Sequence, residues 1–340
     1  QLGGVHLACE QASNLLTKVL EWGRLMSYLE QSTRYISYDS RFGGRYRYYR
    51  DPEIMDSSFG ARYIGDMDRI FDTYAHLVPQ MQDFVRDQFP KHPDDGDFVY
   101  RQAVKAKAFD ALRGLLPAAS LSNVGIYGTG QAYEALLLRM RSHPLPESRY
   151  YADLMLRELR KVIPSFLERV DREDRGVVWS EYLQETREDT ADVVAALFPE
   201  GSIVDPSPTV RLVDFDPEGE VKMIASMMYP HSTMSEDQLE RRVAGMNHED
   251  RMAVARAYVG DRRNRRHKPG RALERPFYRF DVLVDYGAFR DLQRHRMLSM
   301  DWQNLSPHHG YISSPLVNAA GMGAVYEEAM ERSAALYDLL

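Results

Sequence analysis

Apolar residues at helical spacing dominate the first part of the chain. Leu15, Leu16, Val19 and Leu20, followed by Leu25 and Met26, recur every three or four positions, as on one face of a helix. This pattern predicts a helix over residues 8–31. Similar runs, separated by prolines, predict further helices over residues 60–88, 97–115, 121–141 and 147–170.

The second part of the chain has strand-like runs as well as helical ones. Residues 210–215, 221–228 and 277–284 are rich in β-branched or aromatic side chains and predict strands. Helical patterns follow over 235–259 and 285–302, and a last helix begins near Pro315. Prolines and glycines with acidic residues over 201–219 predict a linker. We therefore expect an α+β fold with two domains, residues 1–200 and 220–340.

Length and composition support folded domains and exclude several classes of protein. A chain of 340 residues that is 44% hydrophobic can form two cores. Its net charge of −7 argues against a globally basic nucleic-acid binder. The single cysteine, Cys9, excludes an internal disulfide and a cysteine-built zinc site, and fits a reducing cytoplasm. The chain also has no run of about 18 apolar residues, so we expect no membrane helix.

The two ends of the sequence resemble cut points. The chain does not begin with Met, and it stops inside an apolar helical pattern over residues 334–340. We therefore expect a fragment truncated at both ends, in which the first domain lacks its N-terminal strands and the second its final helices.

Arg294-His295-Arg296 is a candidate ligand site at the end of a predicted helix. Two guanidiniums and an imidazole within three residues can surround an anionic, planar ligand, because guanidiniums bind phosphates well. A solvated basic helix end is the alternative, and the triplet alone favours it.

Two segments together resemble the motif R-H-R-x-x-S-x-N-E-x-S-x-R-Y of flavin-dependent thymidylate synthases. Residues 294–299 match its first six positions, after which Asp301, Trp302, Asn304 and Ser306 replace Asn, Glu, Ser and Arg. Residues 27–35 match its later positions through Ser27, Glu30, Ser32, Arg34 and Tyr35, but only Arg24 remains of the triplet and Leu29 replaces Asn. The resemblance implies two helix-rich halves, each with a small sheet, related by a pseudo-twofold axis.

Three shorter segments are similar to the same family. His267, Glu274, Phe277 and Phe280 resemble the family's segment G-H-x-S-x-x-E-H-x-x-F-x-F before the motif strand. Residues 136–143 with Glu147 resemble its late L-x-L-R helix, and Leu116-Pro117 precedes that helix. The resemblance covers roughly residues 1–50, 105–160 and 220–311.

The resemblance implies a role for each matched residue. Ser32 and Arg34 would bind the phosphate of dUMP, Glu30 would accept a hydrogen bond from a ribose hydroxyl or a flavin group, and Arg139 would act in catalysis by stabilising negative charge on the pyrimidine. The flavin would be held by Arg24, His267, Arg294, His295 and Arg296. FAD would carry hydride from NADPH, methylenetetrahydrofolate would supply the carbon, and the product would be dTMP.

Departures from the family pattern leave several functions open. A Gln is expected three residues before the triplet, but Val19 and Asp291 stand there, and Gly128 and Gly130 replace an Asn and an Arg. Neither half is a complete synthase, so we expect the halves to complement each other, in a homodimer that mimics the family's tetramer. The alternatives are a degenerate copy kept for folding, an enzyme acting on another pyrimidine nucleotide, or an inactive flavin- or nucleotide-binding homologue.

Three other features have ordinary explanations beside functional ones. The Arg- and Tyr-rich loop 41–50 could stack on bases, or be a packed linker, which its composition favours. The basic run 262–268 could attract phosphates, or be a solvated loop. His308-His309 lacks a carboxylate at ligand spacing, so we expect no metal site.

Overall fold

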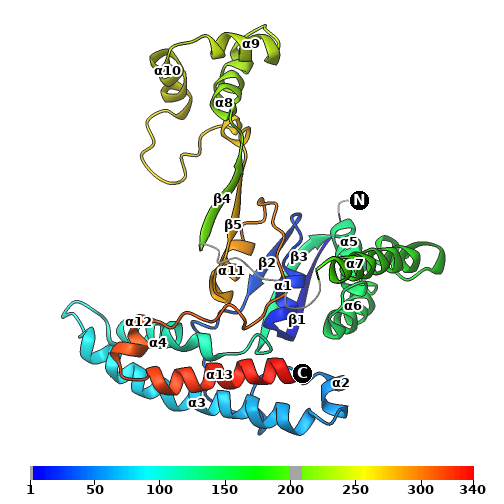
Figure 1. Ribbon diagram of the computed structural model, residues 1–340, viewed down its shortest axis with the longest axis vertical. Coiled ribbons are helices and arrows are strands. Elements are labelled where there is room, and N and C mark those ends of the chain that lie inside the picture. Colours follow the sequence, from blue (N-terminus) through cyan, green and yellow to red (C-terminus); the bar gives the residue numbers. More distant parts are fainter. Residues whose placement is uncertain (1–2, 199–208) are drawn as a thin grey trace. The chain divides into compact units, whose positions relative to one another are not determined.

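The computed structural model describes residues 3–198 and 209–340 (Figure 1). The described residues form two compact units, one made of 3–198 with 285–340 and the other of 209–284. These units differ from the expected halves, because residues 285–340 pack with the N-terminal part of the chain. Of the expected linker, positions 201–208 lie outside the described residues, and strand β4 begins at Val210.

A three-stranded antiparallel sheet forms part of the first unit. Its strands are β1 (Gly4–Ser13), β2 (Met26–Glu30) and β3 (Leu121–Thr129), in the order β1-β3-β2. A short helix, α1 (Asn14–Leu20), connects β1 to β2. The predicted helix over 8–31 is therefore wrong except over α1, and the first part of the chain does contain strands.

The incorrect helix predictions have a physical explanation. Side chains along β3 alternate between buried and more exposed positions, which is the period of a strand, so the helix predicted over 121–141 begins only at Gly130. In the first segment, Ser13 stops β1 and caps α1, since its hydroxyl accepts a hydrogen bond from the amide of Leu16 at 3.0 Å. The apolar residues of α1, together with Leu25 and Met26 beyond it, therefore resemble one long helical pattern.

One hydrophobic core lies between this sheet and the helices that follow it. The helices are α5 (Gly130–Arg141) and α6 (Pro146–Leu159), with the 3-10 turn η2 (Pro164–Phe166) and the π-helical turn η3 (Glu173–Val177) leading into α7 (Val178–Leu197). Leu16, Val124 and Leu136 contribute to the core from α1, β3 and α5.

A second core of the first unit joins helices from both ends of the sequence. It is formed by α3 (Gly60–Gln88), α4 (Asp97–Leu112), α12 (Pro315–Ala319) and α13 (Gly323–Leu339), next to the short α2 (Pro52–Asp56) and η1 (Arg113–Leu115). In Figure 1, α13 lies along α3. This packing explains why the C-terminal residues belong to the first unit.

The Arg- and Tyr-rich loop packs on α3. Tyr38, Tyr46 and Tyr48 are buried around Phe71, with ring centroids 6.5, 5.2 and 5.5 Å from its ring. The loop's arginines cover the tyrosine rings, for example Arg50 over Tyr48 at 3.9 Å. Buried rings cannot stack on bases, so the prediction of a packed linker is confirmed.

The second unit pairs two strands and packs three helices. Strands β4 (Val210–Phe215) and β5 (Tyr278–Val282) are antiparallel. The helices are α8 (Gly219–Met228), α9 (Glu236–Ala244) and α10 (His248–Val259), with 3-10 turns η4 (Tyr229–His231) and η5 (Arg271–Glu274). The strand predicted over 221–228 is wrong, because Ile224, Ala225 and Met227 pack as one side of a helix.

The α+β class is confirmed by these helices and small antiparallel sheets. None of the helices within residues 3–198 and 209–340 is long and apolar enough to cross a bilayer. The pseudo-twofold relation between two halves stays a prediction.

Phe71→Ala should destabilise the protein by about 3–5 kcal/mol, because the substitution leaves a cavity among three buried tyrosine rings. The matched control is Phe98→Ala, whose side chain is 66% exposed and should change stability by less than about 0.5 kcal/mol. Urea unfolding measures both. Equal effects of the two substitutions would contradict the packed position of the loop.

Candidate functional site

The helix that precedes Arg294 packs against the start of the chain. Helix α11 (Tyr286–Gln293) donates three hydrogen bonds to α1: from the Tyr286 hydroxyl to the carbonyl of Asn14 (2.8 Å), from Arg290 to the side chain of Asn14 (2.9 Å), and from Gln293 to the carbonyl of Lys18 (3.0 Å). Segments about 270 residues apart therefore form one site.

A buried cluster of charges lies at the centre of this contact. Glu30, at the end of β2, accepts hydrogen bonds from Arg294 (2.8 Å), Lys18 (3.4 Å) and the hydroxyl of Thr17 (3.2 Å). Lys18 also pairs with Glu21 at 2.9 Å. The side chains of Lys18, Glu21 and Glu30 are all less than one tenth exposed. Two carboxylates and two cations balance, so the cluster carries no net charge.

The neighbouring charges set the protonation of the two carboxyls. Burial alone would raise the pKa of Glu30, but Lys18 and Arg294 outweigh it and hold that pKa below its ordinary value. Burial and the nearby charge of Glu30 raise the pKa of Glu21. Glu30 is therefore the carboxyl that loses its proton more readily, and its carboxylate fixes the arginine.

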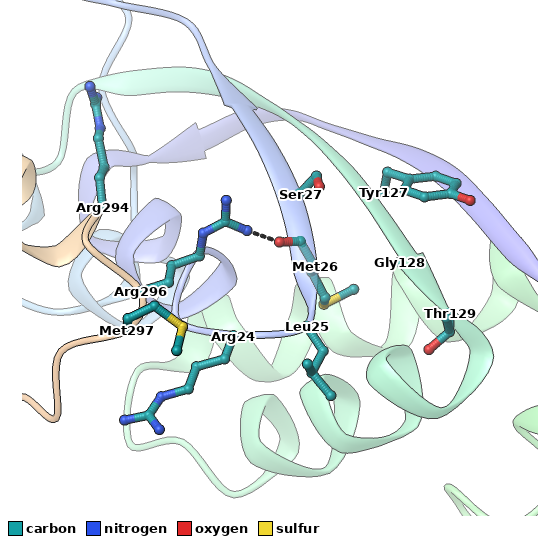
Figure 2. A pocket seen from close by; sticks show the side chains of 10 residues that line it. All are labelled: Arg24, Leu25, Met26, Ser27, Tyr127, Gly128, Thr129, Arg294, Arg296 and Met297. Atoms are coloured by element: carbon teal, nitrogen blue, oxygen red, sulfur yellow. Dashed lines mark hydrogen bonds between the residues drawn. The ribbon is translucent and has the colours of Figure 1, made fainter. Parts of the chain in front are cut away.

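A pocket of about 520 Å³ lies beside β2 and β3 (Figure 2). Its lining includes the guanidinium-bearing Arg24, Arg294 and Arg296, with no carboxylate among the residues that form it. Arg296 donates a hydrogen bond to the backbone carbonyl of Met26, as Figure 2 shows. Gly128 forms part of the wall opposite, where a Cβ atom would approach Met26 Cε to 2.5 Å. The pocket is suited to phosphates or another anionic group.

A second pocket, of about 250 Å³, lies between the loop after β2 and α11. The end of β2 contributes Glu30, the loop contributes Ser32 and Arg34 among others, and α11 contributes Arg290 and Asp291. Arg34 pairs with Asp291 at 3.4 Å and with Asp110 at 3.6 Å. The Ser32 hydroxyl accepts a hydrogen bond from the backbone amide of Arg34 at 3.3 Å, and this bond stabilises a turn of the loop beside the pocket.

Arg294 lines both pockets. Its ion pairs with Glu30 (2.8 Å) and Asp291 (3.5 Å) fix it between them. The structure therefore brings together Arg24, Glu30, Ser32, Arg34, Arg294 and Arg296, which were predicted from two distant segments.

Three other predicted site residues lie outside these pockets. Arg139 lines neither pocket; its guanidinium lies 5.2 Å from the centre of the Trp22 ring, and burial lowers its pKa. His295 is exposed and lines neither pocket. His267 belongs to the second unit, where its ring contacts the amide of Arg263 and the side chain of Asn264. The roles expected of these residues stay predictions.

The sequence patterns did not indicate Lys18, Arg113 or Arg290, yet the structure places all three at the site. The sequence did contain one indication of a role for Lys18, because this charged residue lies among the apolar positions of the helix predicted over residues 8–31. Arg113 and Arg290 resemble ordinary surface cations in sequence, and only the fold brings them to the pocket.

The geometry agrees with a family match over the first part of the chain. Residues 3–165 match the family described as thymidylate synthase complementing protein, so the resemblance predicted from the motifs is confirmed there. The matched range contains the three strands of the sheet, with Glu30 at the end of β2, helix α1, and the loop with Ser32 and Arg34. The Arg294–Arg296 segment lies outside them.

Relatives similar to the whole chain exist in bacteria and an archaeon. The chain is 40% identical to a UPF0159 protein of Chlamydia pneumoniae over 99% of its own length and 38% identical to one of Chlamydia muridarum over 100% of it. It covers 64% of each of these relatives, which is less than two thirds of their length. A UPF0159 protein of Thermoplasma acidophilum is 29% identical over the whole chain, which covers 71% of it.

Lys18→Met should destabilise the protein by about 3–5 kcal/mol at pH 7, because it leaves two buried carboxyls without their shared cation. Losing Lys18 raises the folded-state pKa of both carboxyls. The penalty is therefore fully present above these raised folded-state pKa values and shrinks as the pH falls from them through the unfolded value of about 4.3. Chemical unfolding at pH 7 and near pH 4 measures the difference.

The matched control for Lys18→Met is Lys161→Met. Lys161 pairs with Glu158 on the surface, so this substitution should change stability little at either pH. A Lys18→Met penalty that is the same at both pH values would show that the charges are not its cause.

Proposed function

We propose that this chain forms the site of a flavin-dependent thymidylate synthase, which converts dUMP to dTMP with FAD, NADPH and methylenetetrahydrofolate. The observation that supports this most strongly is the position of Arg294, which lines both an arginine-rich pocket and a smaller pocket beside the Ser32–Arg34 loop. One cation shared by two neighbouring pockets suits two anionic ligands that must react with each other. The family match over residues 3–165 supports the same class of reaction.

The smaller pocket would bind the nucleotide. Arg34, Arg113 and Arg290 line it from three different elements and outnumber the acidic Glu30 and Asp291. With Arg294 added, the pocket has an excess of positive charge, which favours a phosphate monoester. Ser32 supplies a hydroxyl next to these guanidiniums, and the fixed carboxylate of Glu30 can accept a hydrogen bond from a sugar hydroxyl.

The larger pocket would hold part of the flavin. The chemistry of its donors fits, because Arg24, Arg294 and Arg296 can bind phosphate oxygens, while Met26 and Met297 offer apolar contacts. FAD bound there would supply hydride transfer. The chain's own residues would orient the two ligands, and Arg294, held by Glu30, would fix their relative position.

Arg139 would act on the pyrimidine only if the ligand or a side chain moved toward it. Its Nε is buried without a hydrogen-bond partner within the described residues, so this guanidinium has a donor to spare. We retain Arg139 as the proposed catalytic cation on that observation. His295 and His267 stay proposed flavin contacts on the resemblance alone.

A second candidate function is the modification of a different pyrimidine nucleotide. Asp291 stands where the family has Gln, and it lines the nucleotide pocket. A carboxylate only accepts hydrogen bonds, whereas an amide also donates, so this change alters which base edges are complementary. An inactive homologue that binds flavin or nucleotide is the remaining alternative. The proposal also includes a cytoplasmic homodimer, in keeping with the family's tetramer.

The protein should purify yellow with bound FAD, and Arg294→Ala should purify nearly colourless, since it removes the cation shared by the two pockets. The control is Arg157→Ala on α6, an exposed arginine outside both pockets, which should keep its flavin. An absorbance spectrum of each protein decides. Stoichiometric FAD in Arg294→Ala would refute the assignment of the larger pocket.

The same preparation separates the candidate functions. NADPH oxidation that depends on dUMP and methylenetetrahydrofolate supports the synthase, and oxidation that depends on another pyrimidine nucleotide supports the second candidate. A yellow protein without any such activity supports the inactive homologue.

Asp291→Asn should tighten dUMP binding by about two- to fivefold, because Asp291 competes with the phosphate for Arg34 and Arg294. Arg34→Ala should weaken the same binding by about tenfold or more, through the loss of a charge-assisted hydrogen bond. Calorimetry measures both, with the distant Asp83→Asn as control. If Asp291→Asn weakens binding, then the aspartate contacts the ligand instead of competing with it.

A further inference from the structure

Helices α1 and α11 begin in the same way. The Ser13 side chain caps α1 and the Asp285 side chain caps α11, each by accepting the amide three residues further on, at 3.0 and 3.1 Å. The capping residues Ser13 and Asp285 are 272 residues apart in the sequence, the same separation as that of Asn14 and Tyr286. Adding 272 to a residue number in the first segment therefore gives the number of its equivalent in the second segment.

Contacts between the two segments are reciprocal under this shift. Arg24 donates to the carbonyl of Leu298 at 3.2 Å, and Arg296 donates to the carbonyl of Met26 (Figure 2). Arg296 is the equivalent of Arg24, and Leu298 is the equivalent of Met26. When residue i contacts j and the equivalent of j contacts the equivalent of i, the two segments are related by a twofold axis.

The position of the axis follows from a contact between equivalent residues. The Tyr286 hydroxyl donates to the carbonyl of Asn14, its own equivalent, at 2.8 Å. Equivalent residues meet only near the axis that relates them. We propose that residues 13–30 and 285–302 are two copies of one substructure, packed about a local twofold axis near Asn14 and Tyr286, and that only one of the two equivalent positions on either side of it remains a ligand site.

The retained position is the ion pair of Arg294 with Glu30, at 2.8 Å. The equivalents of these residues are Trp22 and Trp302, which also contact each other, with ring centroids 5.0 Å apart and planes at 68°. The same two positions therefore meet on both sides of the axis. On one side they form an ion pair beside two pockets, and on the other an edge-to-face aromatic pair.

The loop that follows has lost its anion-binding groups on the aromatic side. The equivalents of Ser32 and Arg34 are Asn304 and Ser306, so no guanidinium is present where Arg34 would stand. Phe289 adds a third ring, 5.5 Å from that of Trp302. Aromatic packing has replaced the ion pair at this position, with the Arg139 guanidinium 5.2 Å from the centre of the Trp22 ring, and the chain keeps one nucleotide site.

The twofold relation is independent of the proposed function, whereas the number of ligand sites rests on it. One experiment is therefore needed for each. To test the twofold relation, the double variant Trp22→Arg, Trp302→Glu introduces an Arg–Glu pair on the aromatic side. This pair is the equivalent of Arg294 and Glu30 on the other side. Both tryptophans are about half exposed, at 46% and 40%, so the protein should tolerate the change.

The control for this transplant replaces the carboxylate by an amide of the same shape. Trp22→Arg with Trp302→Glu should melt at a higher temperature than Trp22→Arg with Trp302→Gln, and the difference should shrink at high salt because the pair is partly exposed. Equal melting temperatures would overturn the twofold relation, since residues at equivalent positions should form the transplanted pair as Arg294 and Glu30 do, although strand β2 has no counterpart over residues 298–302.

The unchanged protein tests the number of sites through calorimetric titration with dUMP. One dUMP bound per chain supports the proposal, and two per chain overturn it. An absence of binding would refute the proposed function together with the single site, and the transplant would still decide the twofold relation.

Discussion

The carboxylate of Glu30 is almost completely buried, and burying a charge is costly unless opposite charges compensate it. Lys18 provides one compensating charge from within the same part of the chain. Arg294 provides the other from a segment 264 residues further on. This need for compensation makes Glu30 a fixed point between β2 and α11, and both candidate pockets take their geometry from it. A half-exposed arginine would otherwise sample many rotamers, whereas a buried carboxylate partner holds it in one.

The arginines of the motif divide into two kinds of role. Arg24 and Arg296 donate to backbone carbonyls of the opposite segment, so they stabilise the contact between the segments while lining the larger pocket. Arg294 pairs with carboxylates instead and lines both pockets. This division explains why the first segment retains Arg24 although Trp22 and Gly23 replace the rest of its triplet: the contact with the opposite segment requires that guanidinium on both sides.

The sequence predicted most long helices and several residues that line the candidate pockets, but not the strands beside them. Helix α3 was predicted with its observed bounds, since its apolar face is long and regular. Strands β1 and β2 were missed, because α1 supplies a helical period between them and β2 has only five residues. The motif predicted Glu30, Ser32, Arg34 and Arg294 as candidate site residues, and the structure places all four around the smaller pocket. Arg113 and Arg290 could not be identified in that way, because their contribution depends on long-range packing that no local pattern records.

A crystal structure with 5-bromo-dUMP tests the central claim most directly, because the anomalous signal of bromine locates the base independently of the phosphate. The account predicts one bromine peak per chain beside the smaller pocket, with the phosphate contacting Arg34 and Arg294 and the Glu30–Arg294 ion pair intact. A nucleotide bound elsewhere, or one that separates Arg294 from Glu30, would contradict the account.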